Sequence, residues 1–237
     1  MEIIGIILLI ATICNFLLGL FVFLKEPSKK LNLLFGIFGF LTSSWVFTNL
    51  MVGLQKTLFW LKSSYAFGAL VPVFALLWSL ELCDRKITKP RTILISGLAL
   101  LFFLASYIDG LIIEHVKTIS FGEFEGEFGS LFPFYSFYMF GILASIVYVL
   151  ASRYYKAEGI RKIQISYVLI GTTLYISIVL IVTFISPQLG VFKFMSLDSP
   201  SSLILLIFTA LAITRYHLFE IRVILTEILI GVMGIIL

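Results

Sequence analysis

Residues 3–24 read IIGIILLIATICNFLLGLFVFL, an apolar run without a single charged side chain. A transmembrane α-helix needs about 20 mostly apolar residues, so this run predicts a membrane-spanning helix. Only Met1 and Glu2 precede it, whereas a cleaved signal peptide begins with a basic segment. We therefore expect this first helix to be retained.

Six further apolar runs follow, and together with the first they predict an all-α membrane protein, a bundle of seven transmembrane helices. The chain is 60% hydrophobic and only 13% charged, whereas a soluble domain carries about 25% charged residues. The six further spans are expected at 31–54, 60–83, 92–108, 132–151, 164–186 and 201–214. An apolar run at 223–237 is expected to begin another helix that the end of the chain cuts off, as in a fragment or a truncated gene product.

Basic residues gather at alternate connections between these spans. Thirteen of the 17 Lys and Arg residues lie in 25–30, 84–91, 152–163 and the segment after the seventh span. The other side carries Lys56, Lys62, Lys117 and Lys193. Since short basic connections stay in the cytoplasm, we expect the N-terminus outside and the segment after the seventh span inside.

The longest connection on the outer side, 109–131, predicts a small β-hairpin. Its first half is rich in Ile and Val, and Gly122, Gly126 and Gly129 follow. β-branched residues next to glycine-rich turns are typical of paired strands. We expect this hairpin to lie over the outer mouth of the bundle.

The charge pattern within the spans argues against several functions. The centres of the seven spans lack Asp, Glu, Lys, Arg and His, which ion-coupled carriers need there. The seventh span also lacks the lysine of a retinal receptor. Glu81 is expected to pair with Arg85, four residues on. The sequence predicts no catalytic site, no cofactor site, no metal site and no nucleic-acid-binding surface, and Cys14 and Cys83 are expected to be buried small side chains.

Uncharged polar and aromatic groups within the spans have two interpretations. They can bond across helices and stabilise packing, or they can line a cavity for a ligand. The candidate cavity residues are Asn15, Trp45, Asn49, Thr173 and Tyr175.

A second set of residues is expected to anchor the helices at the membrane–water interfaces, where tryptophan and basic side chains are enriched. These candidate anchors are Trp60, Arg85, Lys86, Arg161 and Lys162. Pro72 lies within the third span and is expected to kink it.

Residues 212–222 read AITRYHLFEIR. This stretch resembles the exit motif of the N-terminal seven-transmembrane sensor region of bacterial sensor histidine kinases, AI-x-x-Y-x-L-F-[DE]-I-R. His217 stands where an arginine is more usual. Asn15–Gly19 (NFLLG), Asn32 and Trp45 also resemble the family. The resemblance implies a sensor domain over 1–222, followed by the further helix at 223–237.

The resemblance also implies a multi-pass protein of the cell membrane that detects an unidentified small molecule, a peptide or the state of the membrane. Its partners would be the lipid bilayer, a cytoplasmic kinase module and a response regulator, and the full-length protein would be a homodimer. The 237 residues themselves would not be an enzyme, and nothing around His217 resembles a phosphoacceptor site. The expected signal-relay junction consists of Arg215, Tyr216, Leu218, Phe219, Glu220, Ile221 and Arg222.

Two other interpretations remain open. The chain can be a stand-alone membrane scaffold or partner subunit, which predicts a natural stop near residue 237. It can also be a small transporter, which predicts charged or unwound sites at the midplane of the bundle.

Overall fold

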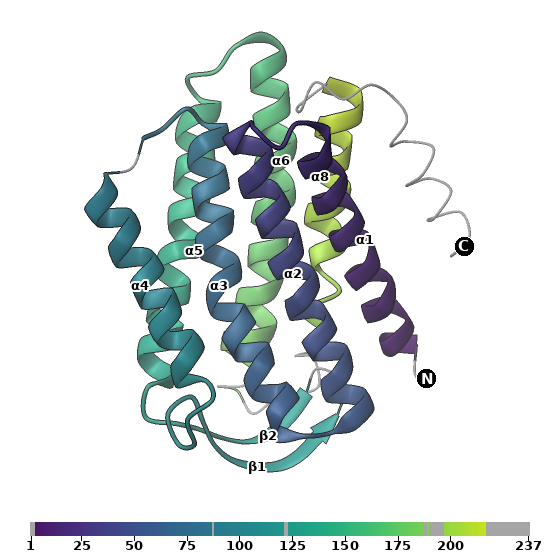
Figure 1. Ribbon diagram of the computed structural model, residues 1–237, viewed down its shortest axis with the longest axis vertical. Helices are drawn as coiled ribbons and strands as arrows, with labels where there is room; N and C mark the ends of the chain where they lie inside the picture. Colours follow the sequence, from purple (N-terminus) through teal and green to yellow (C-terminus); the bar gives the residue numbers. More distant parts are fainter. Residues whose placement is uncertain (1–2, 87, 121–122, 187–188, 190–196, 217–237) are drawn as a thin grey trace.

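The computed structural model describes residues 3–86, 88–120, 123–186, 189 and 197–216. Within them the chain forms an elongated helical bundle that a small sheet closes at one end (Figure 1). The elements are α1 (Ile3–Lys25), α2 (Lys30–Gln55), α3 (Leu58–Leu82), α4 (Lys89–Ala105), β1 (Ile113–Ser120), β2 (Glu123–Phe128), α5 (Phe132–Tyr154), α6 (Gly159–Val179), the π-helix η1 (Leu180–Ile185) and α8 (Ser202–Tyr216).

Five of the described helices are long and apolar enough to cross a membrane: α1, α2, α3, α5, and α6 with its continuation into η1. The two others, α4 with 17 residues and α8 with 15, are shorter. The predicted run 92–108 lies three residues later than α4, because Pro90 sits in the first turn of that helix, where its missing N–H costs nothing. The predicted further helix at 223–237 lies outside the described residues.

The predicted hairpin is confirmed. Strands β1 and β2 pair antiparallel, with Ile113 opposite Phe128 and Ser120 opposite Glu123. We call this end of the bundle the hairpin end. The opposite end carries the connections 25–30, 84–91 and 152–163, and we call it the basic end.

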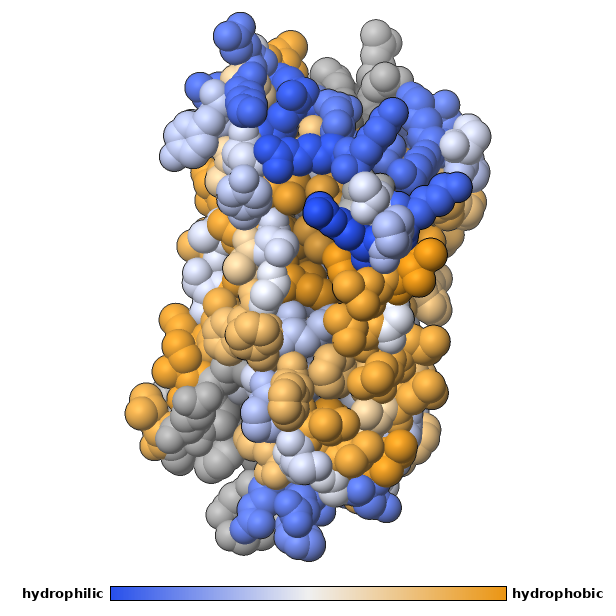
Figure 2. Space-filling model, turned by 90° about the vertical axis from the view of Figure 1, so that its left-hand side faces the viewer, coloured by the Kyte–Doolittle hydropathy of each residue, from blue (hydrophilic) through white to orange (hydrophobic). Residues whose placement is uncertain are grey.

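The side surface of the bundle is largely apolar. Figure 2 shows hydrophilic residues gathered over the basic end, an apolar region below them and a smaller hydrophilic patch at the hairpin end. On α4, for example, the side chains of Ile93 and Leu94 are 71% and 63% exposed. Such a surface is an aggregation hazard in water and suits contact with lipid.

Helices α1 and α2 approach each other at three glycines, Gly19, Gly36 and Gly39. A Cβ atom built on Gly39 would lie 2.8 Å from the Cα atom of Gly19 and 3.1 Å from the carbonyl oxygen of Asn15. Small residues allow helix backbones to come this close in a membrane, where packing rather than the hydrophobic effect drives association.

Pro72 lies inside α3 and has no N–H to donate to the carbonyl of Gly68, one turn earlier. Two tyrosines of α5 donate hydrogen bonds to neighbouring carbonyls of α3: Tyr135 Oη to Tyr65 O at 3.1 Å and Tyr138 Oη to Ala69 O at 2.7 Å. Neither bond reaches the carbonyl of Gly68 itself. These contacts join α3 to α5 in the half of the bundle nearest the hairpin.

Candidate functional site

The turn that precedes α8 carries several buried polar side chains. Its sequence, Asp198-Ser199-Pro200-Ser201-Ser202, begins the last described helix. Ser199 and Ser202 are each 1% exposed. Because an unpaired polar group is costly in an apolar environment, each of these side chains needs a partner on a neighbouring helix.

Asn49 of α2 supplies one such partner. Its Nδ2 atom donates to Ser199 Oγ at 2.7 Å and to the carbonyl of Trp45 at 3.2 Å. Its Oδ1 atom accepts a hydrogen bond from Ser64 Oγ of α3 at 2.8 Å. A single amide therefore holds α2, α3 and the start of α8 together.

Asp198 ends this chain of hydrogen bonds. Ser199 Oγ donates to Asp198 Oδ1 at 2.8 Å, and Thr183 Oγ1 of η1 donates to Asp198 Oδ2 at 3.2 Å. π-Helical turns are rare and are often found at functional sites. We call Asn49, Ser64, Thr183, Asp198 and Ser199 the Asp198 cluster.

The carboxyl of Asp198 lies in the turn before α8, outside the spanning helices. Burial raises its pKa to about 6, while the hydrogen bonds from Ser199 and Thr183 act in the opposite direction. None of the ion pairs formed among the described residues involves Asp198. In the part of the chain that the structure describes, its negative charge is therefore stabilised by the hydroxyl groups of Ser199 and Thr183 and by the backbone N–H of Ser199, without a cation.

A second contact ties α8 to α1. Asn15 Nδ2 donates to Ser202 Oγ at 3.1 Å and to the carbonyl of Ala11 at 2.8 Å. Asn15 is 7% exposed. The start of α8 is thus hydrogen-bonded to both α1 and α2.

From the Asp198 cluster toward the basic end, a cavity of about 50 Å³ lies between α2, α3, α5, α6 and α8. Trp45 and Tyr175 line it, together with Thr172 and Leu205. Most of its remaining lining is apolar.

Four of the five predicted cavity residues face the interior. Asn15 and Asn49 tether α8, and Trp45 and Tyr175 line the cavity. The side chain of Thr173 is exposed, and its neighbour Thr172 lines the cavity instead. Adjacent residues of a helix point about 100° apart, so only one of the two threonines can face the cavity.

Sequence reasoning missed Asp198 and Ser199. A charged residue in a connection is ordinary, so Asp198 carried no signal as a single residue. The available signal was the combination of an acidic residue and three serines directly before an apolar run, which is typical of a helix N-terminus. Ser64 and Thr183 also escaped notice, because hydroxyl residues are common in membrane helices.

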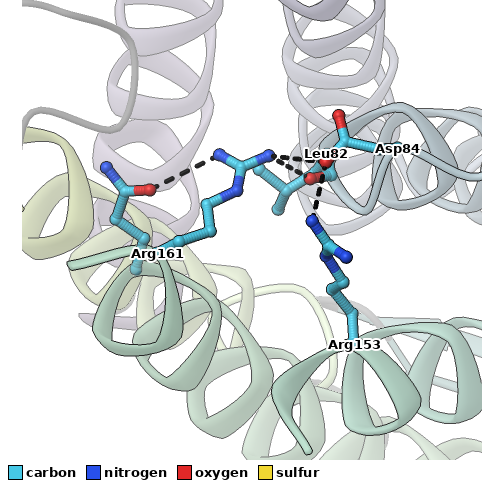
Figure 3. A network of polar contacts seen from close by, with 5 residues as sticks. Leu82, Asp84, Arg153 and Arg161 are labelled. Carbon is cyan, nitrogen blue, oxygen red and sulfur yellow. Dashed lines mark hydrogen bonds and ion pairs between the residues drawn. The ribbon is translucent and has the colours of Figure 1, made fainter. Parts of the chain in front are cut away.

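A cluster of polar contacts ties α3 to α5 and α6 at the basic end (Figure 3). Arg153 Nη2 donates to Asp84 Oδ2 at 3.0 Å. Arg161 donates to the carbonyl of Leu82 and lies 3.8 Å from the Asp84 carboxylate. A guanidinium at this position satisfies a terminal carbonyl of α3 and complements the helix dipole.

The expected pair of Glu81 with Arg85 is wrong. Glu81 Oε2 lies 2.6 Å from Lys30 Nζ at the start of α2. Helix α3 ends at Leu82, and Asp84 adopts a left-handed conformation with φ 54°, so the helical i,i+4 geometry is lost. Arg85 lies instead over the ring of Tyr148, 5.8 Å from its centroid.

The predicted anchors lie near the two ends of the bundle. Trp60 Nε1 donates to Gln55 Oε1 at 2.7 Å at the hairpin end. Lys86 is exposed at the basic end, and Lys162 Nζ lies 5.1 Å from the centroid of the Tyr154 ring. Their role at a membrane interface stays a prediction.

The signal-relay junction is only partly described. The backbone of Arg215 and Tyr216 closes α8. Leu218, Phe219, Glu220, Ile221 and Arg222 lie outside the described residues. Among the residues that the structure describes, no group of three His, Cys, Asp or Glu side chains could hold a metal ion.

These features define a class: a helical membrane protein whose last described helix is tethered by buried polar contacts. A family model described as the N-terminal seven-transmembrane region of histidine kinase matches residues 7–222. The chain therefore belongs to this family of membrane sensor regions. Neither the comparison with curated proteins nor that with solved structures found a match.

Proposed function

We propose that this chain is the membrane-embedded input domain of a two-component sensor histidine kinase. It detects a signal from the outer solution or the bilayer and relays it through α8 to a cytoplasmic kinase module. That module phosphorylates its own histidine and passes the phosphate to a response regulator, and the full-length protein acts as a homodimer. The family membership and the apolar surface support this proposal.

The single observation that carries the proposal is the tethering of α8. Asn49 and Asn15, from two different helices, bond to Ser199 and Ser202 at the start of α8. The other end of α8 leads to Arg215 and the expected relay junction. A ligand that changes the contacts at the start of this helix can therefore change the position of its far end.

The relay needs two states of the bundle with different affinities for the ligand. In one state the Asp198 cluster holds α8 against α2 and α3. In the other state these hydrogen bonds are broken and α8 is free to shift. A net hydrogen bond contributes about 1 kcal/mol, so the loss of one shifts the ratio of the two states about fivefold.

Substitution of Ser199 by alanine tests the relay. In the full-length kinase in membrane vesicles, Ser199→Ala is expected to change the rate of autophosphorylation about threefold to tenfold, because it removes the hydrogen bond accepted from Asn49 and the one donated to Asp198. Ser145→Ala is the matched control, since the half-buried Ser145 hydroxyl donates to the carbonyl of Gly141 on its own helix and to no other helix that the structure describes. Equal rates for both variants and the parent, at equal membrane levels, would contradict the relay.

The proposed orientation places the hairpin end outside and the basic end in the cytoplasm, with α4 and α8 completing seven spans. The excess of basic residues in alternate connections supports it. In intact cells, a cysteine at Glu127 on β2 is expected to react with an impermeant maleimide, and a cysteine at Lys86 is expected to react only after lysis. Both native cysteines are buried, which keeps the background low. Labelling of the Lys86 position from the medium would overturn the orientation.

A further inference from the structure

Helices α1 and α2, side by side in Figure 1, leave an apolar groove on the side surface of the bundle. The groove has a volume of about 240 Å³. Gly19 and Gly36 line it and, having no side chains, leave its space open. The exposed side chains of Leu20, Leu33 and Phe40 also line it. No polar side chain of the described residues belongs to this lining, so the groove suits an apolar segment of a ligand.

The groove lies at the depth of one lipid leaflet. Its lining covers positions two to six residues before the end of α1 at Lys25, and three to ten residues after the start of α2 at Lys30. At a rise of about 1.5 Å per residue, the groove extends from about 3 to about 15 Å from the basic end. The hydrocarbon core of a bilayer is about 30 Å thick, so each leaflet contributes about 15 Å. An acyl chain of the leaflet at the basic end therefore lies alongside the groove.

A cationic side chain lies at the basic end of the same groove. Lys29 directly precedes α2 and is on the same helical face as Leu33 and Phe40, four and eleven residues later. Its side chain is 44% exposed and pairs with Glu26 at 2.9 Å. Exposed ion pairs contribute little to stability, so this ammonium group can turn to another anion at small cost.

The start of α2 adds a second attraction for an anion. Its first turn contains no acidic residue, and no described side chain caps its backbone N–H groups. The positive end of the helix dipole therefore points toward the headgroup region of the bilayer. The connection 25–30 carries three lysines against one glutamate, and the side chain of Lys30 is 70% exposed even though it pairs with Glu81. An apolar groove thus ends at a basic rim.

We propose that this groove binds one anionic phospholipid of the leaflet at the basic end. An acyl chain lies along α1 and α2, and the phosphate lies beside Lys29 and the start of α2. Basic pockets between membrane helices bind anionic headgroups in this way. A second copy of the chain fits less well, because a symmetric pair meeting at this groove would bring its two basic connections together. Lipid binding needs neither the kinase module nor the relay, so it goes beyond the proposed function.

Photo-crosslinking tests the site in the 237-residue chain in nanodiscs of phosphatidylcholine. The probe is phosphatidylglycerol with a diazirine on one acyl chain, and mass spectrometry locates the crosslinked residues. We expect crosslinks at Leu20, Leu33 and Phe40 that saturate with the probe. An excess of unlabelled phosphatidylglycerol should remove them, and the surrounding phosphatidylcholine should not. Crosslinks at Ile93 and Leu94, which are exposed on α4 away from the groove, should rise in proportion to the probe.

Three variants test the headgroup contact. Lys29→Gln is expected to weaken binding of the probe at the groove about fivefold, which is the contribution of one lysine near an anionic lipid surface. Glu26→Gln breaks the same ion pair but keeps the lysine, so binding should be equal or tighter. Lys86→Gln, at an exposed lysine of another basic connection, should leave binding unchanged.

Four results would overturn the inference. They are groove crosslinks that do not saturate, equal competition by the two lipids, equal weakening in Lys29→Gln and Glu26→Gln, and loss of the crosslinks in nanodiscs that hold two copies of the chain. The last result would show that a second copy covers the groove. Because crosslinking is measured without kinase activity, a failure of the relay in the full-length protein is seen separately.

Discussion

Substitution of Gly39 by leucine is expected to lower the free energy of unfolding by about 3 kcal/mol or more, at the upper end of the cost of overpacking. Even a Cβ atom at this position would lie 2.8 Å from the Cα atom of Gly19. That neighbour is backbone and cannot move aside by rotating a side chain. Helices α1 and α2 must therefore separate.

The separation has a second consequence at the start of α8. The same Cβ atom would lie 3.1 Å from the carbonyl oxygen of Asn15. Asn15 also donates to Ser202, so a displaced α1 strains the contact that tethers α8. Gly39→Leu is therefore expected to weaken both the packing of the bundle and the hydrogen bond at the start of its last described helix.

Thermal unfolding in detergent, followed by circular dichroism, measures this effect. The matched control is Gly97→Leu on α4, where a Cβ atom meets nothing within 4 Å. Leucine has a higher helix propensity than glycine, so the control should be as stable as the parent or slightly more stable. If Gly39→Leu melts together with Gly97→Leu, the close approach of α1 and α2 is wrong.

For the buried polar residues, the sequence predicts which side chains need a partner but not which partner they find. Asn15 and Asn49 could be identified because an amide within an apolar run needs a hydrogen-bond partner. Their partners, Ser202 and Ser199, lie 187 and 150 positions away along the chain, and no local pattern connects them. The type of residue was therefore predictable, and the contact was not.

The rotation of the helices was equally hard to predict. Residues 164–186 are apolar on most faces, so the pattern does not show which face turns inward. The sequence alone therefore does not show that Thr172, rather than Thr173, lines the cavity. The hairpin, in contrast, was predictable, because β-branched residues and glycines in a water-facing connection follow the ordinary rules for strands and turns.

We expect the stability of the protein to depend on pH because of Asp198. Its pKa is about 6 in the folded protein, because burial disfavours the charged form, and about 4 for an ordinary aspartate. Below about pH 4 the carboxyl is protonated in both the folded and the unfolded state. In that range it therefore adds no pH dependence to the free energy of unfolding. Between about pH 4 and pH 6 the folded protein binds more protons than the unfolded chain, so the free energy of unfolding falls as the pH rises.

Above about pH 6 the Asp198 carboxyl is ionised in both the folded and the unfolded state. The free energy of unfolding is then lower by the full cost of burying the charge. Two pKa units correspond to about 3 kcal/mol. We expect about 2 kcal/mol, because the residue is only partly buried and keeps some contact with solvent. Tyr65, Tyr135 and Tyr175 lie within electrostatic range of Asp198. An ordinary tyrosine titrates near pH 10, far above this range.

Asp198→Asn removes the titrating group while nearly keeping its shape. Unfolding followed by tryptophan fluorescence between pH 4 and pH 7.5 is expected to show a fall of about 2 kcal/mol in the parent that is missing in Asp198→Asn. Glu127→Gln, at an exposed position on β2, is the control and should keep the fall, because its carboxyl is not part of the Asp198 cluster. Parallel pH profiles for Asp198→Asn and the parent would show that the Asp198 carboxylate is solvated. The turn before α8 would then be less firmly packed than the hydrogen bonds from Ser199 and Thr183 to this carboxylate indicate.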